Sequence, residues 1–286
     1  MEFGSLSRAA EYCNYSQSAV SQIVNSLEHE LGMSLLHRSH AGVWLTSEGE
    51  HLLPYIRNLS RAHIELSEKA SELLGVESGL IRIGTFSSIS CHLLAPILKD
   101  FKAQHPNIRF ELYQGDYQKI ETWISDGIVD FGFVDLPTLR EFDTIPIRDD
   151  RMLALLPANH PYADEAFVPL KLFEQEPVVL LKEGTEKEVL EMFRKQRLKP
   201  KIEYLVEDDY TIMSMVENGL GISILGELVL QKITYRIVIK ETMPKFSRKM
   251  GIAIKDRREA SLAVRCFLDY VEENLDSYVS HNPLPG

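Results

Sequence analysis

The chain has 286 residues, of which 44% are hydrophobic and 26% charged, so it is long and apolar enough for about two folded domains, which excludes bulk disorder. Its 31 basic and 42 acidic side chains give a net charge of −11. Global positive charge therefore gives no argument for nucleic-acid binding, and any such function must rest on a local motif.

Cysteine usage and hydropathy indicate a reducing compartment. Cys13, Cys91 and Cys266 are far apart and form no CxxC pair, which argues against a structural zinc site or a disulfide framework. The N-terminus has no basic segment followed by an apolar run, and no stretch of about 18 apolar residues occurs. We expect a cytoplasmic protein that does not span a membrane and binds no metal or cofactor.

The first 46 residues predict two short helices and then a hairpin. Ala9 and Ala10 allow close helix approach, and Ser16 is suited to cap the second helix. That helix has an apolar side that we expect to be buried, formed by Ala19, Val20, Ile23, Val24, Leu27 and Leu31. Its polar face is formed by Gln17, Ser18, Ser21, Gln22 and Asn25. The polar face fits a DNA major groove, although the periodicity alone suits an ordinary helical hairpin equally well.

Residues 35–46 favour the DNA-binding interpretation. They form two short extended runs around a turn that contains Gly42, which is the pattern of a wing hairpin beside a recognition helix.

Residues 47–74 read as one uninterrupted helix. Ser47 and Glu50 have capping-box spacing at its start, and Pro54 in the second turn removes one hydrogen bond and is expected to bend it. Apolar residues recur in heptad spacing at Leu52, Ile56, Leu59, Leu66, Ala70 and Leu73, with His63 as a tolerated polar member of the same seam. This seam predicts a coiled-coil dimer, and Gly75 and Gly79 bracket a hinge.

From residue 80 onward, short apolar strands alternate with amphipathic helices, which predicts an α/β domain. The expected strands are 81–85, 108–113, 131–135, 152–156, 178–181, 202–206, 222–225, 235–239 and 250–254. The expected helices are 90–104, 117–127, 186–197, 209–218 and 257–275. Two similar β-α-β clusters indicate two lobes joined by two crossovers, with a small-molecule cleft between them.

Three segments of the N-terminal region resemble the LysR-type family of bacterial transcriptional regulators. They run from Gly4 to Ala10, from Ser16 to Ser21 and from Leu27 to Gly32, and the wing ends in the family's Leu45-Thr46-Ser47-Glu48-Gly49 pattern. The resemblance covers essentially the whole chain. It implies a winged helix-turn-helix (1–46), a linker helix with hinge (47–78) and a two-lobed, periplasmic-binding-protein-like effector domain (79–286). Lobe I is expected at about 80–154 and 255–280, and lobe II at about 155–254.

The chain departs from the family pattern in two ways. Family members usually carry a further helix before the position of Gly4, so we expect a DNA-binding unit that lacks its first helix. Residues 1–74 also hold five basic and nine acidic side chains, and Gln22 and Asn25 stand where relatives often have Arg. Since phosphate contacts supply most nonspecific affinity, one protomer is expected to bind DNA weakly, and dimerisation to double the contacts.

The expected DNA-binding residues are Ser16, Gln17, Ser18, Ser21, Gln22, Asn25, Arg38 and Thr46. The expected effector-binding residues lie in loops that join a strand end to a helix start, where free N–H groups attract anions: Thr85, Phe86, Ser87, Ser88, Gly115 and Thr185. Of these, Thr85, Ser87, Ser88 and Thr185 take the role by resemblance, and a plain capping role is a close alternative for each. An anionic metabolite is the expected effector class.

The leading prediction is therefore a homodimeric or homotetrameric regulator that binds double-stranded promoter DNA and a small-molecule effector. The main alternative is a small-molecule-binding protein without effective DNA binding. An enzyme is not expected, since GxSxG, HExxH and paired carboxylate motifs do not occur. The glycine segments 130–134 and 219–225 are interpreted as structural, because neither GxGxxG nor a Walker lysine is present.

Overall fold

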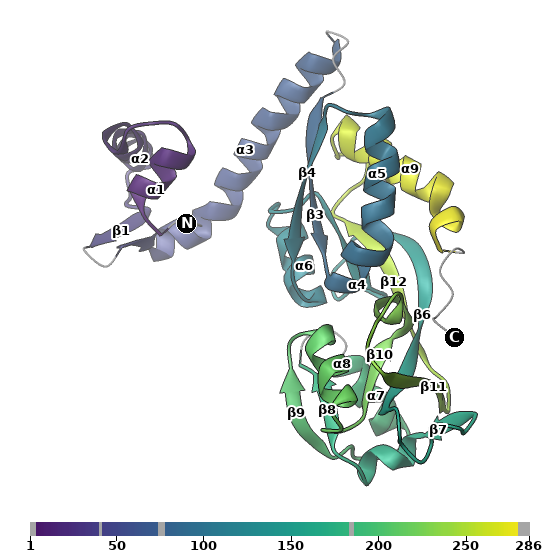
Figure 1. The fold of residues 1–286 in the computed structure, drawn as a ribbon. Helices are drawn as coiled ribbons and strands as arrows, with labels where there is room; N and C mark the ends of the chain where they lie inside the picture. The colour runs from purple at the N-terminus through teal and green to yellow at the C-terminus, as the bar shows by residue number, and fades with distance from the viewer. Residues whose placement is uncertain (1–3, 40–41, 74–77, 183–185, 280–286) are drawn as a thin grey trace. The chain divides into compact units, whose positions relative to one another are not determined.

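The computed structural model describes residues 4–39, 42–73, 78–182 and 186–279 (Figure 1). The chain divides into two compact units, Met1–Leu66 and Ser67–Gly286. The long helix α3 (Ser47–Leu73) begins in the first unit and ends in the second.

The first unit begins with the expected helix-turn-helix and hairpin. Its elements are α1 (Leu6–Tyr12), α2 (Gln17–Leu31), β1 (Leu36–Ser39) and β2 (Gly42–Leu45), and the two strands pair antiparallel. The Ser16 hydroxyl caps α2 by accepting a hydrogen bond of 3.2 Å from the Ala19 N–H, as expected. Gly32 ends the helix in the left-handed region at φ 68°, which glycine adopts without steric cost.

The apolar side of α2 is less covered than predicted. None of its residues is fully buried, and the prediction that Ile23 and Leu31 are buried is wrong, because these side chains are 59% and 38% exposed. An apolar groove of about 270 Å³ lies beside α2, lined among others by Leu6, Val24 and Leu53. The physical reason is that, within the described part of this unit, few neighbouring elements are available to cover the helix.

Helix α3 confirms the prediction of one long helix, and Pro54 lies inside it. Its start differs from the predicted capping box. The Thr46 hydroxyl, one residue earlier than expected, accepts a 2.9 Å hydrogen bond from the Gly49 N–H and donates one of 2.7 Å to the Ser34 carbonyl. The predicted hinge includes residues 74–77, which lie outside the described residues.

The second unit is built on a mixed sheet with the strand order β4-β3-β5-β12-β6-β11-β7, with β10 also paired to β6 and a separate β8-β9 pair. The strands are β3 (Gly79–Thr85), β4 (Ile108–Gln114), β5 (Phe131–Asp135), β6 (Asp143–Pro157), β7 (Phe167–Pro169), β8 (Val178–Leu181), β9 (Ile202–Val206), β10 (Ser223–Gly226), β11 (Ile237–Met243) and β12 (Ser247–Ile254). The helices are α4 (Ser87–Ile89), η1 (Ser90–Leu94), α5 (Ala95–Gln104), α6 (Tyr117–Ser125), η2 (Leu170–Glu174), α7 (Glu186–Lys195), α8 (Asp209–Glu217), η3 (Glu227–Leu230) and α9 (Leu262–Val279).

Two long antiparallel strands, β6 and β12, connect the lobes (Figure 1). Residues 143–151 of β6 pair with β12, whereas residues 152–157 pair with β10 and β11 of the second lobe. The expected lobe boundaries therefore differ from the structure. Strand β12, which the sequence assigns to lobe II, pairs with β5 and contributes Ile252 and Ile254 to the core of lobe I. Because β6 pairs with strands of both lobes, local sequence periodicity cannot show where one lobe ends and the other begins.

Each lobe has its own apolar core. In lobe I, α5 and α9 pack together, with the Phe101 and Phe267 ring centroids 5.0 Å apart. The chain thus returns to lobe I at its C-terminal helix, as expected. Lobe II is built around buried residues of β6, β8 and β10, with Phe173 and Phe193 in contact. Gly132 lies beneath Ile120 of α6, where a Cβ would collide, which supports a structural role for this glycine.

Within the described ranges, no helix combines the length and apolarity needed to cross a membrane. The same residues contain no group of three or more His, Cys, Asp or Glu side chains placed to hold a metal ion.

Candidate functional site

The polar face of α2 carries the DNA-binding candidates. Gln17, Ser18, Gln22 and Asn25 are exposed, and Ser21 is half-buried. The wing arginine Arg38 lies against this face, where its Nη1 donates to the Ser21 hydroxyl at 3.0 Å and its Nη2 to Asn25 Oδ1 at 2.7 Å. The structure therefore brings together three candidates that are up to 17 residues apart in the sequence.

Glu28 couples the wing to α2. Its Oε1 accepts hydrogen bonds from the N–H groups of Leu35 and Leu36, and its Oε2 forms a 3.2 Å ion pair with Arg38. Glu28 thus balances the charge of Arg38 while it fixes the start of β1. The side chain of Arg38 remains 32% exposed, so it can still meet a phosphate or a base edge.

Two further candidates have structural roles. Thr46 is only 6% exposed and both of its hydroxyl hydrogen bonds go to its own unit, so its prediction as a DNA contact is corrected to a cap of α3. Ser16 caps α2 and also contacts the Ser18 hydroxyl at 2.9 Å, but it stays exposed at the helix N-terminus.

A cleft of about 230 Å³ lies between the two lobes of the second unit. Its lining comes from the β3–α4 and β4–α6 loops of lobe I and from β8, β10, α8 and the crossing strand β12: Phe86, Ser87, Ser88, Gln114, Gly115, Asp116, Tyr117, Leu181, Glu207, Asp209, Leu225, Gly226 and Arg248. The expected position of the small-molecule cleft thus agrees with the structure.

Four of the predicted effector residues, Phe86, Ser87, Ser88 and Gly115, line this cleft. Thr85 does not line it. Its side chain is fully buried behind the loop and contacts the Ser90 hydroxyl at 3.0 Å, so a direct effector contact is replaced by a structural role. Thr185, and with it the predicted capping box to Glu188, lies outside the described residues.

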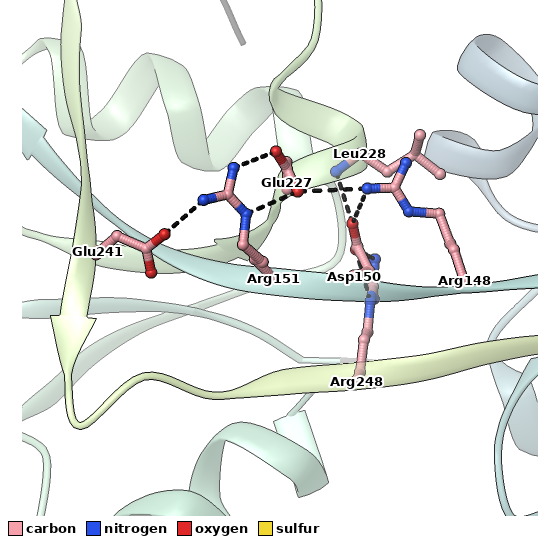
Figure 2. A network of polar contacts seen from close by, with 7 residues as sticks. All are labelled: Arg148, Asp150, Arg151, Glu227, Leu228, Glu241 and Arg248. Atoms are coloured by element: carbon pink, nitrogen blue, oxygen red, sulfur yellow. Dashed lines mark hydrogen bonds and ion pairs between the residues drawn. The ribbon is translucent and has the colours of Figure 1, made fainter. Parts of the chain in front are cut away.

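The floor of the cleft is a buried ion pair between the two crossing strands (Figure 2). Asp150 of β6 and Arg248 of β12 stand opposite each other in the strand register, and Asp150 Oδ2 accepts from Arg248 Nε at 3.0 Å and Nη2 at 2.8 Å. Asp150 is 0% and Arg248 7% exposed. The other oxygen of Asp150 accepts from the Leu228 N–H at 2.9 Å, and Arg248 Nη1 donates to the Tyr117 hydroxyl at 2.7 Å. Arg248 thereby joins the cleft wall of lobe I to the crossing strands.

Four further charged side chains extend this pair along β6 (Figure 2). Arg148 lies 3.3 Å from Glu227, and Arg151 binds Glu227 and Glu241 at 2.5 Å each. Together with Asp150 and Arg248 the network contains three arginines and three carboxylates, so its formal charge is zero. Hydrogen bonding from Arg151 lowers the pKa of Glu227, which keeps this carboxylate ionised.

Gly226 provides the space for the buried pair. A Cβ at this position would collide with the Asp150 carboxylate and the Arg248 guanidinium. On its other side Arg248 lies over the ring of Phe86, with its guanidinium carbon 5.8 Å from the centroid, and Phe86 packs edge-on against Tyr117.

Among the carboxylates of the described cleft lining, Asp209 has the pKa that is shifted most. Burial raises its pKa to about 6, and the nearby Asp208 and Asp150 add to the rise, while Arg248 opposes it. Glu207, on the same side of the cleft, is paired with Lys182 at 2.7 Å, and this hydrogen bond lowers the pKa of Glu207.

Sequence reasoning missed several lining residues. Tyr117 and Asp209 begin helices directly after capping aspartates, Asp116 and Asp208, so those two caps were a usable signal. Nothing local marks Arg248, because its importance depends on Asp150, which is 98 residues away.

A helix-turn-helix unit with a wing and a two-lobed domain with a polar cleft define a DNA-binding regulator that responds to a small molecule. Family models agree: residues 1–50 match the bacterial regulatory helix-turn-helix protein, lysR family, and residues 74–276 match the LysR substrate binding domain. The chain belongs to the LysR family of transcriptional regulators. It is a DNA-binding regulator with an effector-binding domain, and the family consists of regulators rather than enzymes.

Individual relatives match nearly the full length. The uncharacterized HTH-type transcriptional regulator YvbU of Bacillus subtilis (strain 168) is 30% identical over 275 residues, which is 95% of this chain and 94% of that protein. A full-length OxyR variant from Pseudomonas aeruginosa has the same fold, with a TM-score of 0.70 and 23% identity over 94% of this chain and 92% of that one. The effector binding domain of QuiR in complex with shikimate matches with a TM-score of 0.62 and 20% identity over 71% of this chain and 99% of that one.

Proposed function

We propose that the regulator reads promoter DNA with the polar face of α2, and that Arg38 of the wing supports this face. The supporting observation is the exposed row of Gln17, Ser18, Gln22 and Asn25. Short amide and hydroxyl groups pair with base edges in the major groove, whereas Arg38 supplies positive charge next to them.

Ser21→Glu tests this assignment, because it places a carboxylate on the face that enters the groove. We expect at least a 100-fold loss of affinity for DNA from the protein's own upstream region, measured by fluorescence anisotropy across a salt series. Ser277→Glu adds the same charge to an exposed position of α9 and is the matched control. Equal affinity of the Ser21→Glu variant and the parent chain would refute the assignment.

We propose further that a small-molecule effector binds in the cleft between the lobes, in contact with Phe86, Ser87, Ser88 and Gly115. The cleft volume of about 230 Å³ suits a small metabolite, and the QuiR domain, which has the same fold, is in complex with shikimate. Binding would stabilise one arrangement of the lobes and so shift the population of DNA-binding states. Ser87→Trp fills the cleft and is expected to abolish effector-dependent changes in DNA affinity while basal DNA binding persists.

Dimerisation through α3 is the third part of the proposal. Leu59 and Leu66 lie on the predicted seam and are 73% and 69% exposed, which leaves an apolar line for a second copy of the chain. Leu59→Lys is expected to produce a monomer in sedimentation analysis, whereas Asn58→Lys at the neighbouring exposed position leaves the dimer intact. Dimers would pair to tetramers on neighbouring half-sites of promoter DNA in the cytoplasm.

In functional terms we propose the division made from the sequence, with DNA binding in residues 1–46, dimerisation and hinge in 47–78, and effector binding in 79–286. Residues 255–280 belong with the first lobe of the effector domain.

A further inference from the structure

In the described part of the chain, some charged side chains of the cleft form hydrogen bonds or ion pairs with other residues of the protein, whereas Asp209 does not. Asp116 caps α6 by accepting the Lys119 N–H at 2.8 Å, and Glu207 is paired with Lys182. Arg248 is paired with Asp150. Among the described residues, Asp209 is the lining carboxylate for which neither a hydrogen bond nor an ion pair is formed.

The positive charge of Arg248 does not make the cleft cationic. Arg248 belongs to the network of three arginines and three carboxylates, whose formal charge is zero (Figure 2). The remaining charged groups of the described lining are Asp116, Glu207 and Asp209, and one of these is offset by Lys182. The described part of the cleft lining is therefore net negative, and it would repel a simple dicarboxylate.

A second polar group points to a ligand. Ser88 is 2% exposed and lines the cleft from the lobe I side. Among the described residues its hydroxyl forms no side-chain hydrogen bond, and its oxygen is not one of the buried unsatisfied polar atoms, so it is open to the cleft. A ligand in the cleft would thus find an unpaired hydroxyl on one lobe and an unpaired carboxylate on the other.

We infer that the effector of this cleft is a small metabolite with a protonated amine, which lies against Asp209 of lobe II while a polar atom of the same molecule bonds to Ser88 of lobe I. The inference rests on the proposed effector site and replaces the anionic class expected from the sequence. Such a ligand would give Asp209 the direct ion-pair partner that the described residues do not provide, and it would bridge the two lobes when it binds. Burial would strengthen the amine–carboxylate hydrogen bond, since its charges are partly shielded from water.

The test uses the full chain and pairs of probes in which a hydroxyl group replaces the amine. The pairs are L-alanine with L-lactate, L-serine with glycerate, L-aspartate with L-malate, and L-glutamate with 2-hydroxyglutarate. Ethanolamine and putrescine form a third arm that contains an amine without a carboxylate. Thermal shift identifies the binders, and isothermal titration calorimetry gives Kd. We expect binding to be confined to amine-bearing probes, and the third arm decides whether the ligand is a zwitterion or a simple amine.

Asp209→Asn keeps the shape of the side chain and removes its charge, so it should weaken the amine probe about 10- to 100-fold. Ser88→Ala should weaken the same probe about 5- to 10-fold. Asp164→Asn makes the same chemical change at an exposed position outside the cleft and should leave Kd unchanged.

Two results would overturn the inference. If the hydroxy acids bind, lose affinity in Ser88→Ala and are insensitive to Asp209→Asn, the effector cleft stands and the amine class is wrong. If none of the amine probes binds, the amine class is likewise rejected. By contrast, a probe that binds equally well to the Ser87→Trp, Ser88→Ala and Asp209→Asn variants would refute the cleft as the effector site itself.

Discussion

Asp150→Asn removes the charge of a buried carboxylate with almost no change of volume. The side chain is 0% exposed and accepts hydrogen bonds from Arg248 and from the Leu228 N–H. After the substitution Arg248, itself 7% exposed, would keep its charge without its partner. The amide nitrogen of Asn would also face a donor, and Arg148 lies 3.7 Å from the same carboxylate.

The expected loss of unfolding free energy is about 3–5 kcal/mol. At the 2.8 Å separation of Arg248 Nη2 and Asp150 Oδ2 and an effective dielectric constant of about 20, the Coulomb attraction is about 6 kcal/mol. Partial rehydration of the remaining charge reduces this value, and removal of one partner from a buried pair typically costs about 3–5 kcal/mol. Arg248→Met added to Asp150→Asn should restore at least half of the loss, since no buried charge is then left unpaired.

Urea unfolding monitored by tryptophan fluorescence measures this loss. The chain has two tryptophans, Trp44 in the first unit and Trp123 in the second, so a Trp44→Phe background reports the second unit alone. Asp269→Asn is the matched control, because Asp269 is 59% exposed and its ion pair with Arg257 is expected to contribute less than about 1 kcal/mol. A loss below about 1 kcal/mol for Asp150→Asn, or no recovery in the double variant, would refute this account of the crossing strands.

Three further predictions concern the cap of α3, the contact at Gly226 and the titration of Asp209. Thr46→Ala should destabilise the first unit by about 1 kcal/mol, followed by circular dichroism, whereas Thr46→Ser keeps the hydroxyl cap and should match the parent chain. Gly226→Ala forces the Asp150–Arg248 pair apart and should cost about 1–3 kcal/mol in urea unfolding; a neutral result would show that the strands can separate locally. Burial raises the pKa of Asp209 from its ordinary value of 3.8 to about 6 in the folded state. Protonation of Asp209 therefore stabilises the folded chain fully below pH 3.8, and this stabilisation is lost as the pH rises through about 6. Asp209→Asn should therefore stabilise the chain by about 1–3 kcal/mol above pH 6 and by nothing below pH 4, and an equal gain at both pH values would contradict the titration.

Several structural features follow from short-range rules and were predictable from the sequence. Ser16 caps α2 because its hydroxyl reaches the N–H of Ala19, three residues further along, and the break at Gly32 follows from its freedom to adopt positive φ. The run without glycine from residue 50 predicted most of α3, and the strand-to-helix loops at 86–88 and 115–116 predicted part of the cleft wall. Each of these features depends on residues that are neighbours along the chain.

Other features depend on contacts that local patterns do not encode. Ile23 fits the apolar side of an ideal helix, yet it is 59% exposed, since burial depends on what covers a helix and not on the helix alone. Thr46 is a polar residue of a kind that often contacts DNA, but its hydroxyl donates a 2.7 Å hydrogen bond to the carbonyl of Ser34, 12 residues away.

The sequence by itself determined the family, the order of the two domains and the loops that form one wall of the cleft, because helix caps, turns and periodicity are properties of neighbouring residues. The tertiary structure decided the charge of the cleft. Arg248 and Asp209 lie far apart in the sequence. Only the pairing of β6 with β12 shows that Asp150 forms the ion pair with Arg248, while Asp209 forms no direct ion pair among the described residues. Electrostatic balance depends on distances in space, and those distances exist only once the strands have crossed.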